Sequence, residues 1–276
     1  MAGVLFALAW WWRERDAVRH DPALSPVARR VLRESPEPLQ MARSVRISAY
    51  APDDAQAGAI LDEAAFSLSE IAMHLGVEPP TQPIRIFLVA SSNGWEGLVR
   101  AMGSRPDGLA VSLRDEIFLR DGGVEAARPD RLAHELVHVV MRDAYGTNVP
   151  LWLDEGLAGH LGLAVSRDYR SKYGRRVTGE WAGLTGEEVE TIEKLTQRRE
   201  LPDDPAAARF FYRAAQELVT LIENRIGSAR MPAYVADVAT GADWRVALDA
   251  RLEGSPLSSA DLEEALHRQI ALPQRF

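Results

Sequence analysis

The sequence predicts an α+β protein, in which strand-like segments of the N-terminal half are followed by helical segments. Between residues 45 and 119, short apolar runs alternate with turn residues, as is typical of strands. A strongly apolar helical segment follows at residues 131–141, and the chain has helical patterns from residue 186 onward. We therefore expect an N-terminal mixed β-sheet lobe with helices, a central helix and a C-terminal helical lobe.

The composition limits the classes of function that fit this chain. With 276 residues and 46% hydrophobic residues, it is large enough for a sizeable core. A formal net charge of −8 argues against nucleic acid as a partner, because phosphate binding needs a basic surface. The absence of cysteine excludes disulfides and thiolate metal sites, but it leaves the cellular compartment open.

The first 15 residues form a separate segment with three interpretations. Residues 1–12 are uncharged, apolar and rich in tryptophan, and arginines follow them. A twelve-residue helix spans about 18 Å, less than the hydrocarbon core of about 30 Å. The segment is read as a membrane anchor shortened by a misassigned start, as an interfacial helix, or as a terminal helix packed on the domain. It lacks the basic start and cleavage site of a signal peptide, and the side of the membrane is not determined.

The remaining elements follow from proline, glycine and apolar spacing. Residues 16–43 are rich in Pro and Arg and read as a linker with one short helix at 26–34. The sheet lobe, residues 44–163, is expected to contain strands at 45–50 and 83–89, helices at 52–75 and 91–102, and a hairpin of residues 108–113 and 116–119. The helical lobe, residues 164–276, is expected to contain helices at 187–198, 205–226, 231–239, 244–252 and 259–270.

A basic run follows residue 163, and it reads as a solvated loop; the alternative is a site that anchors an acidic group. Its basic residues are Arg167, Arg170, Lys172, Arg175 and Arg176.

The central helix carries the pattern His134-Glu135-x-x-His138, which joins metal ligands and a base. Residues four apart on an α-helix project from one face, so the two imidazoles are able to bind one zinc ion. Glu135 then lies beside the metal, where a carboxylate takes a proton from zinc-bound water, whose pKa is lowered to about 7. The alternative is a buried helix whose histidines bond to backbone, but this leaves costly polar groups in an apolar segment.

A catalytic zinc needs a third protein ligand, and the next helical segment offers candidates. Residues 150–161 open with a proline suited to a helix start, and Asp154 and Glu155 follow in the first turns. The Gly and Asn of residues 143–149 predict a turn that folds this helix back antiparallel to the first. Glu155 is the preferred third ligand, Asp154 is its competitor, and His160 is a further alternative.

Two motifs together carry a family resemblance. The sequence His134-Glu-Leu-Val-His138 followed by Trp152-Leu-Asp-Glu-Gly-Leu-Ala158 resembles the gluzincin zinc metallopeptidases, particularly the bacterial peptidase MA-like family related to thermolysin and the zinc aminopeptidases. The resemblance spans residues 44–270. It implies one zinc ion per chain, held by His134, His138 and Glu155, with Glu135 as general base. It also implies a later tyrosine that stabilises the tetrahedral intermediate.

The segment at residues 209–219 resembles the one that carries this tyrosine in the aminopeptidases, which nominates Tyr212. The alternative is that Tyr212 is an ordinary aromatic of an amphipathic helix. By the same resemblance, one strand of the hairpin at residues 108–119 is the edge to which a peptide substrate adds, unless it is an ordinary sheet edge.

The chain also departs from the family pattern. It has no Gly-x-Met-Glu-Asn-like motif before the zinc helix, and Gly159 stands where thermolysin-like enzymes place a carboxylate that orients a histidine ligand. The sequence therefore predicts a zinc metallopeptidase acting on peptides or proteins. Two alternatives are a catalytically weak zinc-binding scaffold of the same fold and a metal-free structural domain.

Overall fold

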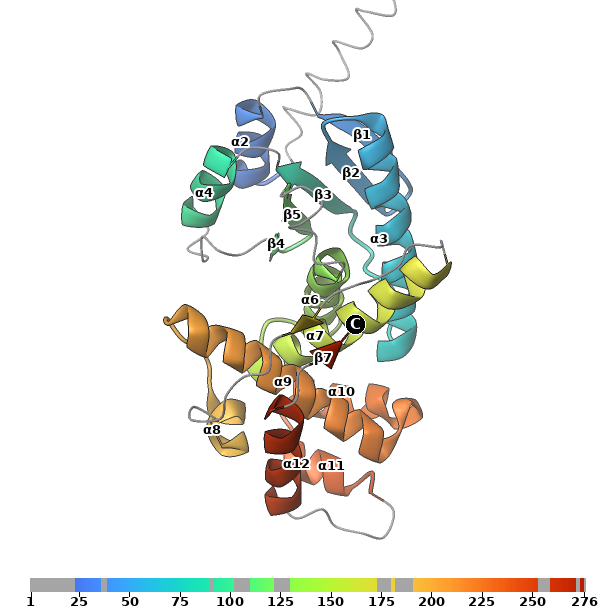
Figure 1. Cartoon of the computed structure of the whole chain (residues 1–276). Coiled ribbons are helices and arrows are strands. Elements are labelled where there is room, and N and C mark those ends of the chain that lie inside the picture. Colours follow the sequence, from blue (N-terminus) through green and yellow to red (C-terminus); the bar gives the residue numbers. More distant parts are fainter. Residues whose placement is uncertain are drawn as a thin grey trace, which may run out of the picture. The chain divides into compact units, whose positions relative to one another are not determined.

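The structure is a computed structural model that describes residues 23–35, 39–89, 92–101, 110–121, 130–172, 180–181, 191–252, 259–271 and 274–275. It contains a five-stranded mixed sheet and many helices, which confirms the predicted α+β class (Figure 1). The chain divides into two compact units. The sheet unit comprises Met1–Leu61 and Ile84–Ala127, and the helical unit comprises Asp62–Pro83 and Arg128–Phe276.

The five strands occur in the order β1-β2-β3-β5-β4. Their bounds are β1 Gln40–Arg43, β2 Ile47–Ala51, β3 Ile84–Val89, β4 Ala110–Leu113 and β5 Glu116–Arg120. Strands β2, β3 and β5 are parallel neighbours, whereas β1 and β4 are antiparallel edge strands. Tyr50, Phe87 and Phe118 lie opposite one another on the three central strands, and their stacked rings are 4.7 and 5.2 Å apart. This row of aromatic rings fixes the register of the central strands.

Helices α2 (Pro26–Glu34) and α4 (Ser92–Ala101) pack with the sheet around one apolar cluster, which includes Leu32, Trp95 and Phe118. Ser25 caps α2 by accepting a hydrogen bond from the Ala28 amide. Its own amide and hydroxyl donate to the buried carboxylate of Glu116 on β5. These bonds attach the start of α2 directly to the sheet.

Helix α3 (Asp54–Leu75) begins in the sheet unit and ends in the helical unit. The other helices of the helical unit have the bounds α6 Arg131–Tyr145, α7 Leu151–Lys172, α8 Ile192–Gln197, α9 Pro205–Ile226, η1 Ser228–Arg230, α10 Met231–Ala239, α11 Trp244–Asp249 and α12 Ser259–Ala271. A small ribbon pairs β6 Glu180–Trp181 with β7 Gln274–Arg275. Helix α7 packs against both α6 and α9, which makes it the central helix of this unit.

The predicted helix bounds in the second half of the chain agree with the structure for some helices and not for others. Helix α8, predicted at 187–198, begins at Ile192 after its N-cap Thr191, and α11, predicted at 244–252, ends at Asp249. Helices α9 and α10 begin and end at the predicted residues. Proline at the first position of α9, the Asp204 side chain that accepts from the Ala207 amide, and Gly227 at φ +80° define its ends. Local capping signals therefore specified this helix.

Two local expectations differ from the structure. The stretch predicted as a linker, residues 16–43, contains β1 as well as the expected helix at 26–34, because residues 40–43 pair with β2. The basic run after residue 163 is helical at least to Lys172, where α7 ends. Leu161, Val165 and Tyr169 are buried at intervals of four residues, so the apolar face continues while the basic residues occupy other faces.

The division into units also differs from the predicted lobes of residues 44–163 and 164–276. Helices α6 and α7 belong to the helical unit, because they pack with each other and with α9. Residues 1–15, interpreted as a membrane segment, lie outside the described residues. Within the described part of the chain, no helix is both long and apolar enough to cross a membrane.

Candidate metal centre

Helix α6 presents its histidines from an almost entirely buried segment. Seven apolar residues between Leu132 and Met141 are buried, so the helix is fixed by packing on several sides. The His134 amide donates to the Asp130 carbonyl at 2.8 Å, which closes the first turn at the first histidine. Gly146 ends the helix with φ +78°, a conformation that favours glycine. The turn predicted at residues 143–149 is therefore shorter than expected, because residues 143–145 belong to α6 and the turn begins at Gly146.

Helix α7 begins directly after Pro150, whose carbonyl accepts from the amides of Leu153 and Asp154. Its contacts with α6 establish the direction of the two helices. Asp154 contacts His138. Gly162, which lies two turns after Asp154 on α7, faces the backbone of His134, which lies one turn before His138 on α6. The helices are thus antiparallel, as expected, and the first turns of α7 lie over the histidine pair.

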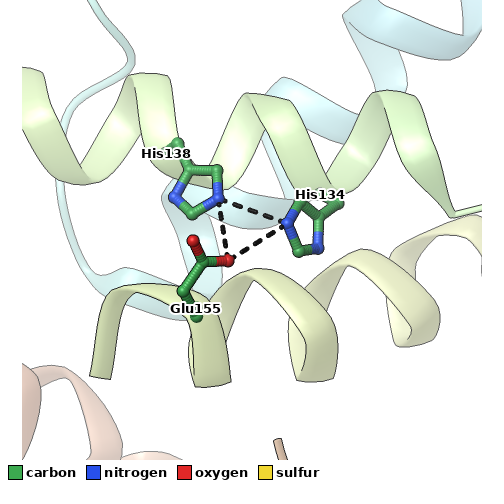
Figure 2. A group of neighbouring side chains, drawn as sticks. All are labelled: His134, His138 and Glu155. Carbon is green, nitrogen blue, oxygen red and sulfur yellow. Dashed lines mark hydrogen bonds and ion pairs between the residues drawn. The ribbon is translucent and has the colours of Figure 1, made fainter. Parts of the chain in front are cut away.

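Three side chains converge in this region: His134, His138 and Glu155 (Figure 2). The Nε2 atoms of the two histidines are 3.2 Å apart, and each lies 3.5 Å from Oε2 of Glu155. That oxygen is buried and has no hydrogen-bond partner among the described residues. Three donor atoms of the kinds that zinc prefers therefore face one common point.

The spacing of these atoms fits a tetrahedral zinc ion. Zinc binds histidine nitrogen and carboxylate oxygen at about 2.0–2.2 Å, which places neighbouring ligand atoms roughly 3.3–3.6 Å apart in a tetrahedron. The three observed separations are 3.2, 3.5 and 3.5 Å. A charge-assisted hydrogen bond would draw the carboxylate to about 2.7–2.9 Å from a ring nitrogen. The two separations of 3.5 Å from the carboxylate are longer than such a bond, whereas the 3.2 Å between the two ring nitrogens is also within hydrogen-bond range.

The electrostatic setting of the cluster couples the three groups. Burial lowers the pKa of His138, but the charges of Asp154 and Glu155 outweigh burial and raise that pKa well above 6.5. Burial raises the pKa of Glu155, but the positive charge of His138 and contacts with both imidazoles hold it far below 4.5. The two opposite pKa shifts both favour the charged form of the group, because each group faces opposite charge.

Asp154 lies behind the cluster rather than in it. Its Oδ2 is 3.0 Å from Nδ1 of His138, while Nε2 on the other side of that ring faces Glu155. A proton on Nδ1 that is donated to Asp154 leaves the Nε2 lone pair directed at the common point. Asp154 therefore orients His138, and this geometry favours Glu155 over Asp154 as a ligand. Sequence reasoning missed this role, because it weighed Asp154 only as a ligand.

The other predicted residues lie on three different helices. Glu135 is buried on α6 between the two histidines, and Tyr212 is half-buried on α9, where its ring is edge-on to Phe211. His160 is bonded elsewhere: Nδ1 is 2.9 Å from Thr220 Oγ1, and Nε2 contacts Glu223 Oε2. Both partners are on α9, so His160 connects α7 to α9 and is not part of the cluster of His134, His138 and Glu155.

Gly159 faces α9 as well. A Cβ at this position would meet the side chain of Gln216, with Oε1 at 2.9 Å. The amide side chain of Gln216 therefore occupies the space that a side chain at position 159 would need.

Comparison with known proteins gives no further assignment, since no family model matches the chain and no curated protein matches it in sequence.

Proposed function

We propose that this protein is a zinc-dependent metallopeptidase of the gluzincin type, with a thermolysin-like arrangement around the zinc helix. The observation that carries the proposal is the convergence of His134, His138 and Glu155, together with a buried glutamate, Glu135, between the two histidines on α6. Two histidines and one carboxylate leave a fourth position for water, which is the arrangement of catalytic rather than structural zinc.

The roles of the residues follow from their positions. Bound zinc would activate water and polarise the scissile carbonyl of a peptide or protein substrate. Glu135 would accept the proton of the attacking water and deliver it to the leaving amine. Asp154 would keep the Nε2 lone pair of His138 available by accepting the Nδ1 proton.

The contacts between α7 and α9 support a role for Tyr212. Three contacts show the direction of the two helices: Gly156 with Ala215, Gly159 with Gln216, and His160 with Thr220. Later residues of α7 contact later residues of α9, so the two helices run in the same direction. Tyr212 is one turn before Gln216, and this register brings its turn toward the first turns of α7, which carry Glu155. We propose that its hydroxyl stabilises the oxyanion of the tetrahedral intermediate.

A combined zinc and cleavage assay tests this function. Purified wild-type protein is expected to contain one zinc per chain and to cleave members of a casein-derived peptide library, with activity lost on chelation and restored by zinc. Glu135→Gln should retain the zinc but lose activity about 10²–10⁴-fold, because the base is gone while the ligands remain. Zinc without cleavage of any peptide would instead favour the scaffold alternative, and a protein without zinc would contradict both.

Tyr212→Phe gives a narrower test. It should retain zinc and folding but lower kcat about 10²–10³-fold with little change in KM, as expected for a donor that acts on the transition state. Phe211→Leu, which changes the neighbouring buried ring, is a control for packing. An unchanged kcat in Tyr212→Phe would remove this residue from the mechanism and leave the zinc site intact.

A further inference from the structure

Helix α7 meets His134 at two separate places. Glu155 lies 3.5 Å from the His134 Nε2 atom, and two turns later Gly162 faces the backbone of the same residue. A Cβ at position 162 would lie 2.9 Å from the His134 amide nitrogen and 3.0 Å from its Cα. The absence of a side chain at Gly162 therefore determines how closely α7 approaches α6 at a proposed zinc ligand.

We propose that Gly162 is a positioning residue for the zinc site, because it sets the distance between the backbone of His134 and the helix that carries Glu155. This inference rests on the proposed zinc site. Gly162 is not itself a proposed ligand, and it approaches His134 only through its backbone.

The size of the effect follows from the contact distances. Ordinary van der Waals contact between a Cβ and a neighbouring heavy atom begins near 3.4 Å. A Cβ at position 162 would lie only 2.9 Å from the His134 amide nitrogen. The obstructing atoms are helix backbone, so they move only with α6 itself. An opening of about 0.5 Å exceeds the tolerance of about ±0.2 Å in metal–ligand distances. Gly162→Ala should therefore separate His134 from Glu155 more than a compact zinc site allows.

The same helix provides a matched control. Gly159→Ala is the same substitution three residues earlier, and its Cβ would meet Gln216, with the movable Oε1 atom as the closest contact at 2.9 Å. This contact is on α9 and involves no proposed ligand. Gly58→Ala on α3 is a second control, because a Cβ there has nothing within 4 Å and gains only helix propensity.

The experiment measures zinc affinity by competition with a chromogenic chelator on the full-length chain, together with the melting temperature of each metal-free protein. Gly162→Ala should bind Zn²⁺ about 10–100-fold more weakly than wild type, as is usual when the support of a ligand is disturbed. Gly159→Ala and Gly58→Ala should stay within about threefold. With Co²⁺ in place of zinc, Gly162→Ala should show a changed visible absorption spectrum, and the two controls should not.

Several outcomes would overturn the inference. If Gly162→Ala lowers the melting temperature but keeps wild-type zinc affinity and the wild-type cobalt spectrum, Gly162 serves packing alone. An equal loss of affinity in Gly159→Ala would also remove the specific role.

If Gly162→Ala does not accumulate as folded protein, the variants are refolded from guanidinium at graded zinc concentrations. The zinc concentration for half recovery should then be at least tenfold higher than for Gly159→Ala, and equal midpoints would contradict the inference. A wild type that binds no zinc would overturn the proposed function itself.

Discussion

Helix α7 takes part in two histidine–carboxylate clusters that differ in how their atoms are paired. In the cluster with α6, Oε2 of Glu155 lies 3.5 Å from two imidazole nitrogens and has no hydrogen-bond partner among the described residues. In the cluster with α9, His160 contacts Thr220 Oγ1 at 2.9 Å through one ring nitrogen and Glu223 directly through the other. In the first cluster the carboxylate oxygen stands 3.5 Å from both ring nitrogens, whereas in the second both ring nitrogens have close partners.

This difference shows that residue type alone does not identify a metal site. Both clusters contain a partly buried histidine and a glutamate on adjacent helices. The hydrogen bonds in the second cluster use both nitrogens of His160, and Thr220 in turn donates to the Gln216 carbonyl at 2.9 Å. We interpret the first cluster as the zinc site and the second as a connection that holds α7 to α9.

The largest expected effect is on zinc binding, which should distinguish Glu155 from Glu223. Glu155→Ala should abolish stoichiometric zinc binding, with a loss beyond the 10–100-fold that is typical of residues around a ligand, because it removes one of three ligands. Glu223→Ala should leave zinc binding unchanged, because Glu223 contacts the histidine that faces α9. Zinc content is measured by elemental analysis after dialysis. If both variants lose zinc equally, the two clusters are not independent; unchanged zinc in Glu155→Ala would contradict the ligand assignment.

A smaller effect is expected at the residue that orients His138. Asp154→Ala should weaken zinc binding about 10–100-fold without abolishing it, because the Nδ1 proton of His138 loses its acceptor. Thr220→Val removes a comparable partner from His160 and should leave zinc affinity within about threefold. The comparison uses chelator competition. Complete loss of zinc in Asp154→Ala would instead indicate that Asp154 is itself a ligand.

The smallest effect concerns stability in acid. The pKa of Glu223 is lowered from 4.5 to about 2, chiefly by the hydrogen bond from His160 and to a lesser extent by Ser228 and His74, against burial, which raises it. A lowered pKa stabilises the folded state above pH 4.5, and this contribution is lost as pH falls through about 2. Glu223→Gln should therefore be less stable than wild type at pH 7, by about 1.5–3 kcal/mol for a hydrogen bond to a charged carboxylate.

The stability difference between wild type and Glu223→Gln should shrink as the pH is lowered from 5 to 2.5 in denaturant unfolding of the metal-free proteins. Because both proteins share every other carboxylate, the difference isolates Glu223. A difference that does not change with pH would show that the His160–Glu223 contact lacks the proposed ionic character.

Structural features were predicted best where neighbouring residues in the sequence determine them. The spacing of His134 and His138 fixes their common helix face, and proline, aspartate and glycine fix the ends of α9. Strand β1 was missed because its four residues lie in a Pro-rich stretch and are strand only through pairing with β2. The basic run to Lys172 read as a loop because its charges obscured a buried face of Leu161, Val165 and Tyr169.

The candidate site was predictable in composition but not in detail. A turn of suitable length made Glu155 the preferred third ligand, but the direction of the His138 ring, which gives Asp154 its role, depends on tertiary packing. The partners of His160 are 60 and 63 residues away, so no local pattern predicts them. The contact of Gly162 with the His134 backbone likewise depends on the packing of two antiparallel helices.

The most direct test of the zinc site is an anomalous difference map, recorded at the zinc absorption edge, from crystals of the zinc-loaded protein. One strong peak is expected at about 2.0–2.2 Å from Nε2 of His134, Nε2 of His138 and Oε2 of Glu155, with a fourth position taken by solvent. A peak at His160 and Glu223 instead, or no peak among the three proposed ligands in protein that contains one zinc per chain, would rule out the proposed zinc site.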